Sequence, residues 1–220
     1  MDFLPLYFDL KSSSALVVGC GVAAVRKVEL LTRAGCGVHW VNSNAEDLAH
    51  FQLDQVRISQ VHALDGVDWS DVQLVVAASG DASQDANVAS IAKDNNIPVN
   101  VVNNAGLSNF VFPSIIDRSP VIAAVSSSGE LPVLTRLLRS RLESTIPNAY
   151  GRLAIIAKQY RKEVKQKITN LNARRRFWEE HLEGQFSEWV FSGDEQRAEA
   201  LLRSSLDEYQ AQSESTGEVY

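Results

Sequence analysis

Cysteine and histidine are scarce in this chain of 220 residues, which has two cysteines and four histidines. Neither cysteine belongs to a Cys-x-x-Cys pair, and no histidine stands at a metal-ligand spacing. The sequence therefore predicts neither a disulfide-stapled secreted fold nor a metal site. We expect reduced thiols, a cytoplasmic location and no protein-bound metal.

Long apolar runs and an excess of basic charge are absent as well. No run approaches the roughly 20 apolar residues of a membrane span, and the N-terminus lacks a basic region followed by a long apolar one. Lysine and arginine number 21 against 27 aspartates and glutamates, which gives a net charge of −6. We therefore expect no membrane insertion and no nucleic-acid partner. The 45% apolar content is that of an ordinary globular protein.

Glycines at one strand-to-helix turn carry the clearest signal. The apolar run Ala15–Val18 meets Gly19 and Gly21, and Ala24 takes the third small position of a G-x-G-x-x-G/A fingerprint. The first glycine permits the tight turn, the second lets a pyrophosphate approach the backbone, and the third small residue lets the helix pack closely on the strand. Amides at the helix N-terminus then face the anion. The pattern predicts a dinucleotide site.

Alternating strand and helix patterns place this turn in a parallel α/β sheet. A helix runs to about Arg33, with Gly35 as its cap, and strand-like runs follow at residues 38–41, 56–61, 72–78 and 97–102. Ligands of such sheets bind beyond the carboxyl ends of the strands. We expect four loops to converge on one crevice; they begin at Gly19, Asn42, Ser79 and Asn103.

The acidic residue that usually binds the ribose, about 20 residues past the glycines, is missing from this pattern. The second strand ends instead in Asn42, Ser43 and Asn44, whose polar side chains can hydrogen-bond a ribose. Charge at this position does not separate NAD from NADP.

Beyond the predicted sheet the composition changes. Residues 112–120 read as a polar connection bounded by prolines, and residues 121–125 read as a strand. A loop of small residues, Ser126 to Ser128, then precedes a helix that carries Arg136. The loop and helix either bind an anionic substrate rich in carboxylates or phosphates, or form a capped helix with solvated arginines.

The stretch over residues 150–182 is mostly helical and strongly basic, and a last amphipathic helix is expected over residues 194–210. A nucleic-acid interface is one interpretation of the basic stretch. Because aromatic residues are sparse there and the whole chain is acidic, a solvated helix face or the wall of an anionic-substrate pocket is favoured. The polar tail, residues 211–217, reads as a linker.

Catalytic side chains are few. Serines are plentiful, but no histidine stands in a recognisable relation to them, so no hydrolytic triad is predicted. Asn103 follows the strand at residues 97–102 and is expected to project towards a bound nicotinamide. Its amide can form hydrogen bonds but cannot accept a proton as a carboxylate does.

A set of motifs spans nearly the whole chain: Met1-Asp-x-Leu-Pro, Val-Val-Gly-x-Gly-x-Ala-x-x-Arg-Lys ending at Lys27, Asn100-Val-Val102, Pro113-Ser-Ile-Ile-Asp-Arg-Ser-Pro120, Ser126-Ser127, Pro132-Val-Leu-x-Arg-Leu-Leu138 and Arg174-Arg-Arg-Phe-Trp-Glu179. Together they resemble the N-terminal half of the siroheme synthase family. The resemblance implies an α/β fold in which a Rossmann-like parallel sheet is followed by a small α+β dimerisation region and a helical C-terminal region.

The resemblance also implies a domain order: an NAD-binding domain at 1–112, a dimerisation region at 113–147, a helical domain at 148–210 and a linker at 211–220. The linker would lead into a uroporphyrinogen-III methyltransferase domain. The implied activity is NAD-dependent oxidation of precorrin-2 to sirohydrochlorin, followed by insertion of Fe²⁺, itself a substrate, to give sirohaem. The implied partners are this tetrapyrrole and a second copy of the chain in a homodimer.

Site residues follow from the same resemblance. Around NAD, the pyrophosphate is lined by Gly19, Gly21, Val22 and Ala23, and the ribose lies by Ser43 and Asn44. The carboxylates of the tetrapyrrole are assigned to Ser126, Ser127, Ser128, Arg118 and Arg136. Ser127 also matches a serine that is phosphorylated in some members.

One position departs from the family pattern. Asn103 stands where the family has an aspartate proposed as the general base in dehydrogenation and as proton acceptor or metal guide in chelation. Asn103 is either a natural variant, with Asp117 or water taking over the proton, or an engineered substitution that traps a bound tetrapyrrole. The alternative function is an NAD- and tetrapyrrole-binding module with weakened catalysis. Loss of a general base slows chemistry by about 10²–10⁴-fold without removing binding.

Overall fold

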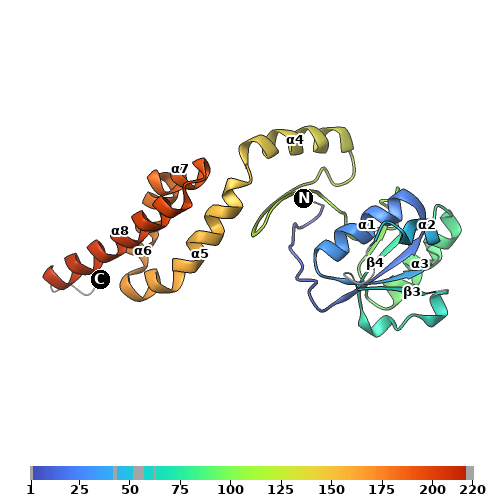
Figure 1. Cartoon of the computed structure of the whole chain (residues 1–220). Helices are drawn as coiled ribbons and strands as arrows, with labels where there is room; N and C mark the ends of the chain where they lie inside the picture. The colour runs from blue at the N-terminus through green and yellow to red at the C-terminus, as the bar shows by residue number, and fades with distance from the viewer. Residues whose placement is uncertain (1, 42–43, 52–56, 62, 217–220) are drawn as a thin grey trace. The chain divides into compact units, whose positions relative to one another are not determined.

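The computed structural model describes residues 2–41, 44–51, 57–61 and 63–216 (Figure 1). The chain forms two compact units. The first, called the α/β unit below, comprises Met1–Phe112 and Ser127–Leu131. The second, called the helical unit, comprises Pro113–Ser126 and Pro132–Tyr220.

Five parallel strands form the sheet of the α/β unit, in the order β3-β2-β1-β4-β5. They are β1 (Ser14–Gly19), β2 (Gly37–Val41), β3 (Ile58–Val61), β4 (Val72–Ala78) and β5 (Val99–Val101). The predicted Rossmann-like parallel sheet is therefore confirmed. Strand order reverses between β1 and β4, and open α/β sheets bind their ligands at such a switch point.

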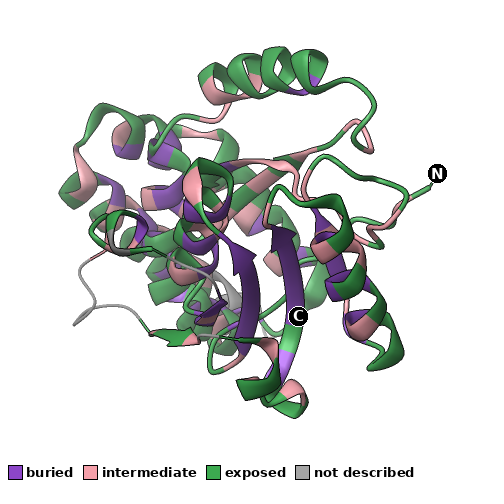
Figure 2. Cartoon of the chain, turned by 90° about the vertical axis from the view of Figure 1, so that its right-hand side faces the viewer, coloured by how far each residue is buried: buried purple, intermediate pink, exposed green. Residues whose placement is uncertain are grey.

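Helices cover both faces of this sheet. They are α1 (Gly21–Arg33), the short α2 (Ala45–Leu48) and α3 (Ala82–Asp94), with 3₁₀ turns η1 (Leu64–Gly66) and η2 (Trp69–Asp71) before β4. Successive side chains of a strand point to opposite faces. Ala15 and Val17 accordingly lie in the core beneath α1, whereas Leu16 and Val18 lie in the core beneath α3. Figure 2 shows the central strands buried over most of their length; in β4 Gln73 is exposed.

The ends of α1 and α3 follow local chemistry. After α1, the N–H of Gly35 bonds the carbonyl of Thr32 at 2.9 Å, and Gly35 has φ +81°, which a residue without Cβ adopts readily. The predicted stop at this glycine is correct. At the start of α3, Asp81 accepts hydrogen bonds from the amides of Ser83 and Gln84, both at 2.8 Å.

The helical unit begins with an antiparallel hairpin of β6 (Ser114–Arg118) and β7 (Val121–Val125). The segment predicted as a polar connection is thus a strand. Five helices follow: α4 (Pro132–Thr145), α5 (Ala149–Lys167), α6 (Leu171–Glu183), α7 (Gln185–Ser192) and α8 (Glu195–Thr216). Their core gathers apolar residues of α5 to α8 around Phe177 and Phe186.

Within the linker expected at 211–220, α8 continues to Thr216. A helix that has already been nucleated can extend through Gln, Ser and Thr, so a polar composition did not end it. Residues 217–220 lie outside the described part of the chain. Among the described residues, no helix is both long and apolar enough to cross a membrane.

Candidate dinucleotide-binding site

The glycine turn joins β1 to α1 at the switch point of the sheet. Gly19 has φ +119°, and a Cβ there would overlap the backbone of Ala78 and Ser79 at the end of the neighbouring strand. Gly21 has φ +76°, and no described heavy atom lies within 4 Å of the position that a Cβ would take. The first glycine therefore permits close strand packing, and the second leaves room for a ligand beside the backbone, as the fingerprint requires.

Trp40 holds the turn from β2. Its indole Nε1 donates a hydrogen bond of 2.8 Å to the carbonyl of Gly19, and the side chain is fully buried. Its ring meets Phe51 edge-on, with 5.8 Å between the ring centroids. The sequence did not single out Trp40, because a tryptophan in an apolar strand reads as core.

Beyond Gly21, the first residues of α1 present an exposed surface to an anion. Its N-cap residue, Cys20, makes no side-chain capping bond, and the first turn contains no acidic residue. Val22 is 68% exposed, and Ala23 is exposed beside it. The first amides of a helix lack intrahelical partners and attract negative charge. The residues present therefore fit a pyrophosphate at this turn.

One carboxylate already reaches the turn. The N–H of Gly21 donates a hydrogen bond of 2.9 Å to Oδ2 of Asp47 in α2, and Asp47 is only 5% exposed. The amide of Asp47 in turn bonds Oδ1 of Asn44 at 2.8 Å. Sequence reasoning missed Asp47, because it lies 26 residues beyond Gly21, whereas the fingerprint expects an acid at about 20. Asn44 is thus placed beside the site, and Ser43 lies outside the described residues.

The loop after β4 is fixed by a buried carboxylate. Asp85, on α3, accepts bonds from the Ser79 amide at 3.0 Å and the Ser79 hydroxyl at 2.6 Å. Gly80 has φ +77°, again with no described heavy atom within 4 Å of a Cβ position. Since β1 and β4 are neighbours, this loop and the glycine turn meet at the same edge of the sheet.

Asn103 follows β5 at that edge. The amide of Val102 bonds the carbonyl of Ala77 at 2.9 Å, which continues the pairing with β4. Asn103 itself is exposed and has φ +62°. Asparagine and aspartate are the non-glycine residues that most readily adopt this left-handed conformation. The backbone conformation at position 103 therefore also suits aspartate, the residue that the siroheme synthase pattern has at this position.

Lys27 is a half-buried cation on α1. Its Nζ lies 3.8 Å from the centroid of the Phe112 ring. Burial lowers the pKa of this amine to about 8, because removal from water disfavours the charged form. The contact with the aromatic face compensates only part of that loss.

The residues assigned to the tetrapyrrole have varied surroundings. Arg118 donates from Nε to the carbonyl of Ile146 at 2.9 Å and from a terminal nitrogen to the carbonyl of Asp117 at 3.1 Å, so its guanidinium braces the hairpin against the end of α4. Arg136 is exposed on α4. Asp117, the alternative proton acceptor, takes bonds from the amide and hydroxyl of Ser119 at 3.0 and 2.6 Å.

The serine loop is a tight turn. Ser128 has φ +57° and Gly129 has φ +88°. Ser127 accepts two bonds, one at its hydroxyl from the amide of Leu131 at 3.1 Å and one at its carbonyl from the amide of Glu130 at 3.0 Å. Ser126 is exposed, and Ser127 and Ser128 are half-buried.

The structure brings together a serine, a histidine and an aspartate that the sequence did not relate. His39 Nδ1 lies 2.6 Å from the hydroxyl of Ser59, and its Nε2 lies 3.8 Å from Oδ2 of Asp71. The second distance exceeds a hydrogen bond. That carboxylate instead accepts a bond of 2.7 Å from the hydroxyl of Ser14. The cluster therefore lacks the base-orienting contact of a hydrolytic triad.

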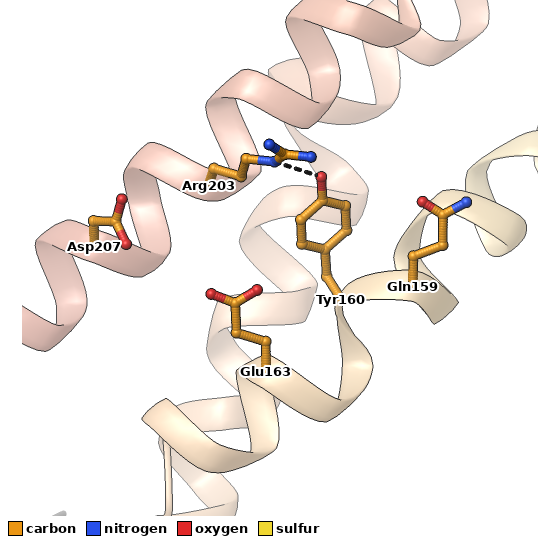
Figure 3. A pocket seen from close by; sticks show the side chains of 5 residues that line it. All are labelled: Gln159, Tyr160, Glu163, Arg203 and Asp207. Atoms are coloured by element: carbon orange, nitrogen blue, oxygen red, sulfur yellow. Dashed lines mark hydrogen bonds between the residues drawn. The ribbon is translucent and has the colours of Figure 1, made fainter.

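A cavity of about 430 Å³ opens between α5 and α8 (Figure 3). The hydroxyl of Tyr160 accepts a bond from Nε of Arg203 at 2.8 Å and lies 2.9 Å from a carboxylate oxygen of Glu199. Two of the lining carboxylates bond Lys167, Asp207 at 2.8 Å and Glu163 at 3.1 Å, and both contacts raise the pKa of the lysine. The basic side chains there are paired with acidic ones, and this arrangement suits helix packing more than recognition of an anion. Among the described residues, no group of three or more His, Cys, Asp and Glu side chains could hold a metal ion.

Comparison with known proteins shows which proteins the chain is similar to. A family model described as putative NAD(P)-binding matches residues 6–114, and one described as the sirohaem synthase dimerisation region matches residues 149–206. The siroheme synthase of Nitrosomonas europaea is 44% identical over 222 residues, which cover all of this chain and 46% of that protein. The siroheme synthase of Hahella chejuensis is 45% identical, again over all of this chain and 47% of its own length. Over its whole length the chain is similar to siroheme synthases.

The chain spans about half the length of these siroheme synthases. Its fold is also similar to that of a solved structure named SirC, precorrin-2 dehydrogenase, with a TM-score of 0.62 and 20% sequence identity over 92% of this chain and 100% of that one. The dimerisation match at 149–206 lies C-terminal to residues 113–147, to which the resemblance assigned dimerisation, and falls within the predicted helical domain at 148–210.

Proposed function

We propose that this chain binds NAD and oxidises precorrin-2 to sirohydrochlorin. The observation that carries the proposal is the glycine turn at the switch point of the sheet, with its open face at Gly21. The similarity to siroheme synthases and the name of the structural neighbour support precorrin-2 as the substrate. Titration of the protein with precorrin-2 and NAD⁺ tests it, because NADH and the sirohydrochlorin spectrum must appear together.

The residues of the turn position the dinucleotide. Gly19 and Gly21 bring the backbone beside the pyrophosphate, Val22 and Ala23 contribute amides of the helix N-terminus, and Asn44 contributes, with Ser43, to the ribose pocket. Bound NAD⁺ supplies the hydride acceptor. The oxidation also releases one proton, so a proton acceptor is required at the macrocycle.

We further propose that the same chain inserts Fe²⁺, as a substrate, into sirohydrochlorin. Metal insertion releases two pyrrole protons, so it needs a proton acceptor just as dehydrogenation does. Anaerobic incubation of the protein with sirohydrochlorin and Fe²⁺ tests this step, since sirohaem has its own absorption spectrum. A rate equal to that of the protein-free reaction would contradict it, while leaving the dehydrogenase proposal intact.

A second function is favoured by one residue. Asn103 occupies the exposed left-handed position after β5, and its amide cannot accept a proton. On this alternative the chain holds NAD and tetrapyrrole but turns them over slowly. Binding of both ligands with little NADH formation would favour it over the dehydrogenase.

The variant Asn103→Asp separates the two functions. The left-handed backbone accepts aspartate, so the variant should fold as the wild type does. If the missing base limits turnover, we expect kcat to rise by about 10²-fold or more. Asn104→Asp is the matched control, because it adds a carboxylate one residue away and keeps the oxygen that accepts the bond from Leu107. A wild-type rate that equals the Asn103→Asp rate would refute the binding-module alternative.

Arginines and the serine loop are proposed to bind the carboxylates of the tetrapyrrole, through Arg118, Arg136 and Ser126 to Ser128. Arg136→Gln should raise KM for precorrin-2 and leave KM for NAD unchanged. Arg139→Gln on the same helix is its control, because Arg139 is paired with Glu143 at 3.0 Å. Equal effects of the two variants would argue against a specific role of Arg136.

Ser127 is proposed as a phosphorylation site. Phosphorylation would replace the hydroxyl that accepts the Leu131 amide and place negative charge beside the proposed carboxylate site. We therefore expect Ser127→Glu, which adds a negative charge, to weaken tetrapyrrole binding more than Ser127→Ala, which only removes one hydroxyl. Fluorescence quenching by sirohydrochlorin measures both.

We also propose that the chain forms a homodimer. The apolar residues of α4 are exposed in the single chain, with Val133 at 55% and Leu137 at 53%, and an exposed apolar helix face is typical of an interface. Leu137→Glu on α4 and Leu171→Glu on α6 test the two regions to which dimerisation is assigned. Light scattering after gel filtration should show a monomer for the variant that lies in the interface and a dimer for the other.

A further inference from the structure

We propose that Asp47 makes this site selective for NAD over NADP, by taking the ribose-binding role for which the end of β2 has no acidic residue. The proposal rests on the proposed function, because it requires a dinucleotide at the glycine turn. It adds the determinant of cofactor choice, which the fingerprint residues themselves leave open.

The position of Asp47 is held from two sides. Its Oδ2 accepts the Gly21 amide at 2.9 Å, and its own amide bonds Oδ1 of Asn44 at 2.8 Å. The following amide, that of Leu48, bonds the carbonyl of Asn44 at 3.1 Å. With only 5% of its surface exposed, the carboxylate has little freedom to turn away. Asp47 is therefore a fixed negative charge at the second glycine of the fingerprint.

Other dinucleotide folds use an acid for the role that we propose for Asp47. There, a carboxylate beyond the second strand hydrogen-bonds the ribose 2′-hydroxyl, next to the glycine turn. Asp47 comes from α2, just beyond β2, and uses one oxygen for Gly21. Its second oxygen can accept a hydroxyl of the ribose. The fingerprint acid is thus present in space although it is displaced along the sequence.

The surrounding charges favour the same dinucleotide. NADP sites place a cation, usually arginine, against the 2′-phosphate. From residue 34 to residue 56 the sequence has no lysine or arginine, and Glu46 adds a second acid beside Asp47. A 2′-phosphate brought against a buried carboxylate meets like charge in surroundings that screen it poorly.

The test is calorimetric titration with NAD⁺ and with NADP⁺ of the wild type, Asp47→Asn and Glu46→Gln, so no catalytic activity is needed. We expect the wild type to bind NAD⁺ about ten-fold or more tightly than NADP⁺. Asp47→Asn keeps an oxygen for the Gly21 amide but removes the charge, and should reduce this ratio by about ten-fold through a gain in NADP⁺ affinity. Glu46→Gln removes one charge from an exposed neighbour that solvent screens, and should reduce the ratio much less than Asp47→Asn does.

Several results would overturn the proposal. Equal affinities of the wild type for NAD⁺ and NADP⁺ would overturn it. An Asp47→Asn variant that changes both affinities by the same factor would also overturn it, because Asp47 would then only compete with the pyrophosphate. If the wild type binds neither dinucleotide, the proposed function fails together with it. If Asp47→Asn does not fold, the same titration of the wild type with two fragments tests the proposal. 2′,5′-ADP, which carries the 2′-phosphate, must bind more weakly than 5′-AMP.

Discussion

Alanine substitutions at the two glycines of the turn should damage different properties of the protein. At Gly19, the added methyl group would overlap the backbone of Ala78 and Ser79, and φ is +119°. Neither neighbour is a flexible side chain, so β1 must shift against β4. At Gly21, φ is +76° but the methyl group meets no described atom within 4 Å. The first substitution is therefore expected to damage the fold, and the second to damage the ligand site.

The magnitudes follow from these two environments. A positive φ costs an alanine roughly 1–2 kcal/mol, and forcing an extra carbon into a packed site costs roughly 1–3 kcal/mol more. Gly19→Ala should therefore lower the free energy of unfolding by about 3 kcal/mol or more. Gly21→Ala incurs only the first cost, about 1 kcal/mol. Its methyl group would stand where the pyrophosphate approaches, and it should weaken NAD binding by about ten-fold or more.

Hydrogen exchange measures the stability of the α/β unit separately from that of the helical unit. Because each 1.4 kcal/mol is a factor of ten in an opening equilibrium, the amides of β1 and β4 should exchange about 100-fold or more faster in Gly19→Ala and about five-fold faster in Gly21→Ala. Calorimetric titration gives the NAD affinity. The reasoning is refuted if the two variants lose equal stability, or if Gly21→Ala binds NAD as the wild type does.

Two further perturbations probe groups that support the site. Lys27→Met should stabilise the protein at pH 7 by roughly 2–3 kcal/mol, because both folded and unfolded lysine are charged there and the folded pKa is only about 8. Between about pH 8 and pH 10.5 the unfolded chain keeps a proton that the folded chain has lost, so wild-type stability rises and the difference from Lys27→Met should shrink. Urea unfolding at pH 7 and pH 10 measures this difference, and one that does not change with pH would contradict the assignment. Trp40→Phe removes the hydrogen bond to Gly19 and leaves a buried carbonyl unpaired, which should cost about 1–3 kcal/mol and weaken NAD binding. The same exchange measurement on β1 tests it, and unchanged protection there would contradict the anchoring role.

Local signals were sufficient for much of the fold. The strand, the turn and the helix from Ser14 to Arg33 depend on an apolar run and glycines that are contiguous in sequence, so their chemistry could be recognised without the structure. The stop at Gly35 is equally local, since a left-handed residue after a helix is usually glycine. The parallel arrangement followed from the alternation of strands and helices.

Pairing between distant segments was not predictable in the same way. Residues 114–118 contain polar groups next to prolines and read as a connection, yet they form β6 because Val121–Val125 provides a partner strand. The helix α8 likewise extends through residues whose polar composition indicated a linker. In both cases, contacts or helix propagation outweighed local composition.

The sequence alone determined the dinucleotide fingerprint at Gly19 and Gly21, because that function resides in backbone geometry that only glycine accommodates there. Only the tertiary structure decided which side chains complete it. Asp47 and Trp40 reach the turn from other elements, 26 and 21 residues from the glycines that they bond. No periodicity or spacing encodes such contacts. They arise because parallel strands bring their carboxyl ends, and the loops that follow them, to one edge of the sheet.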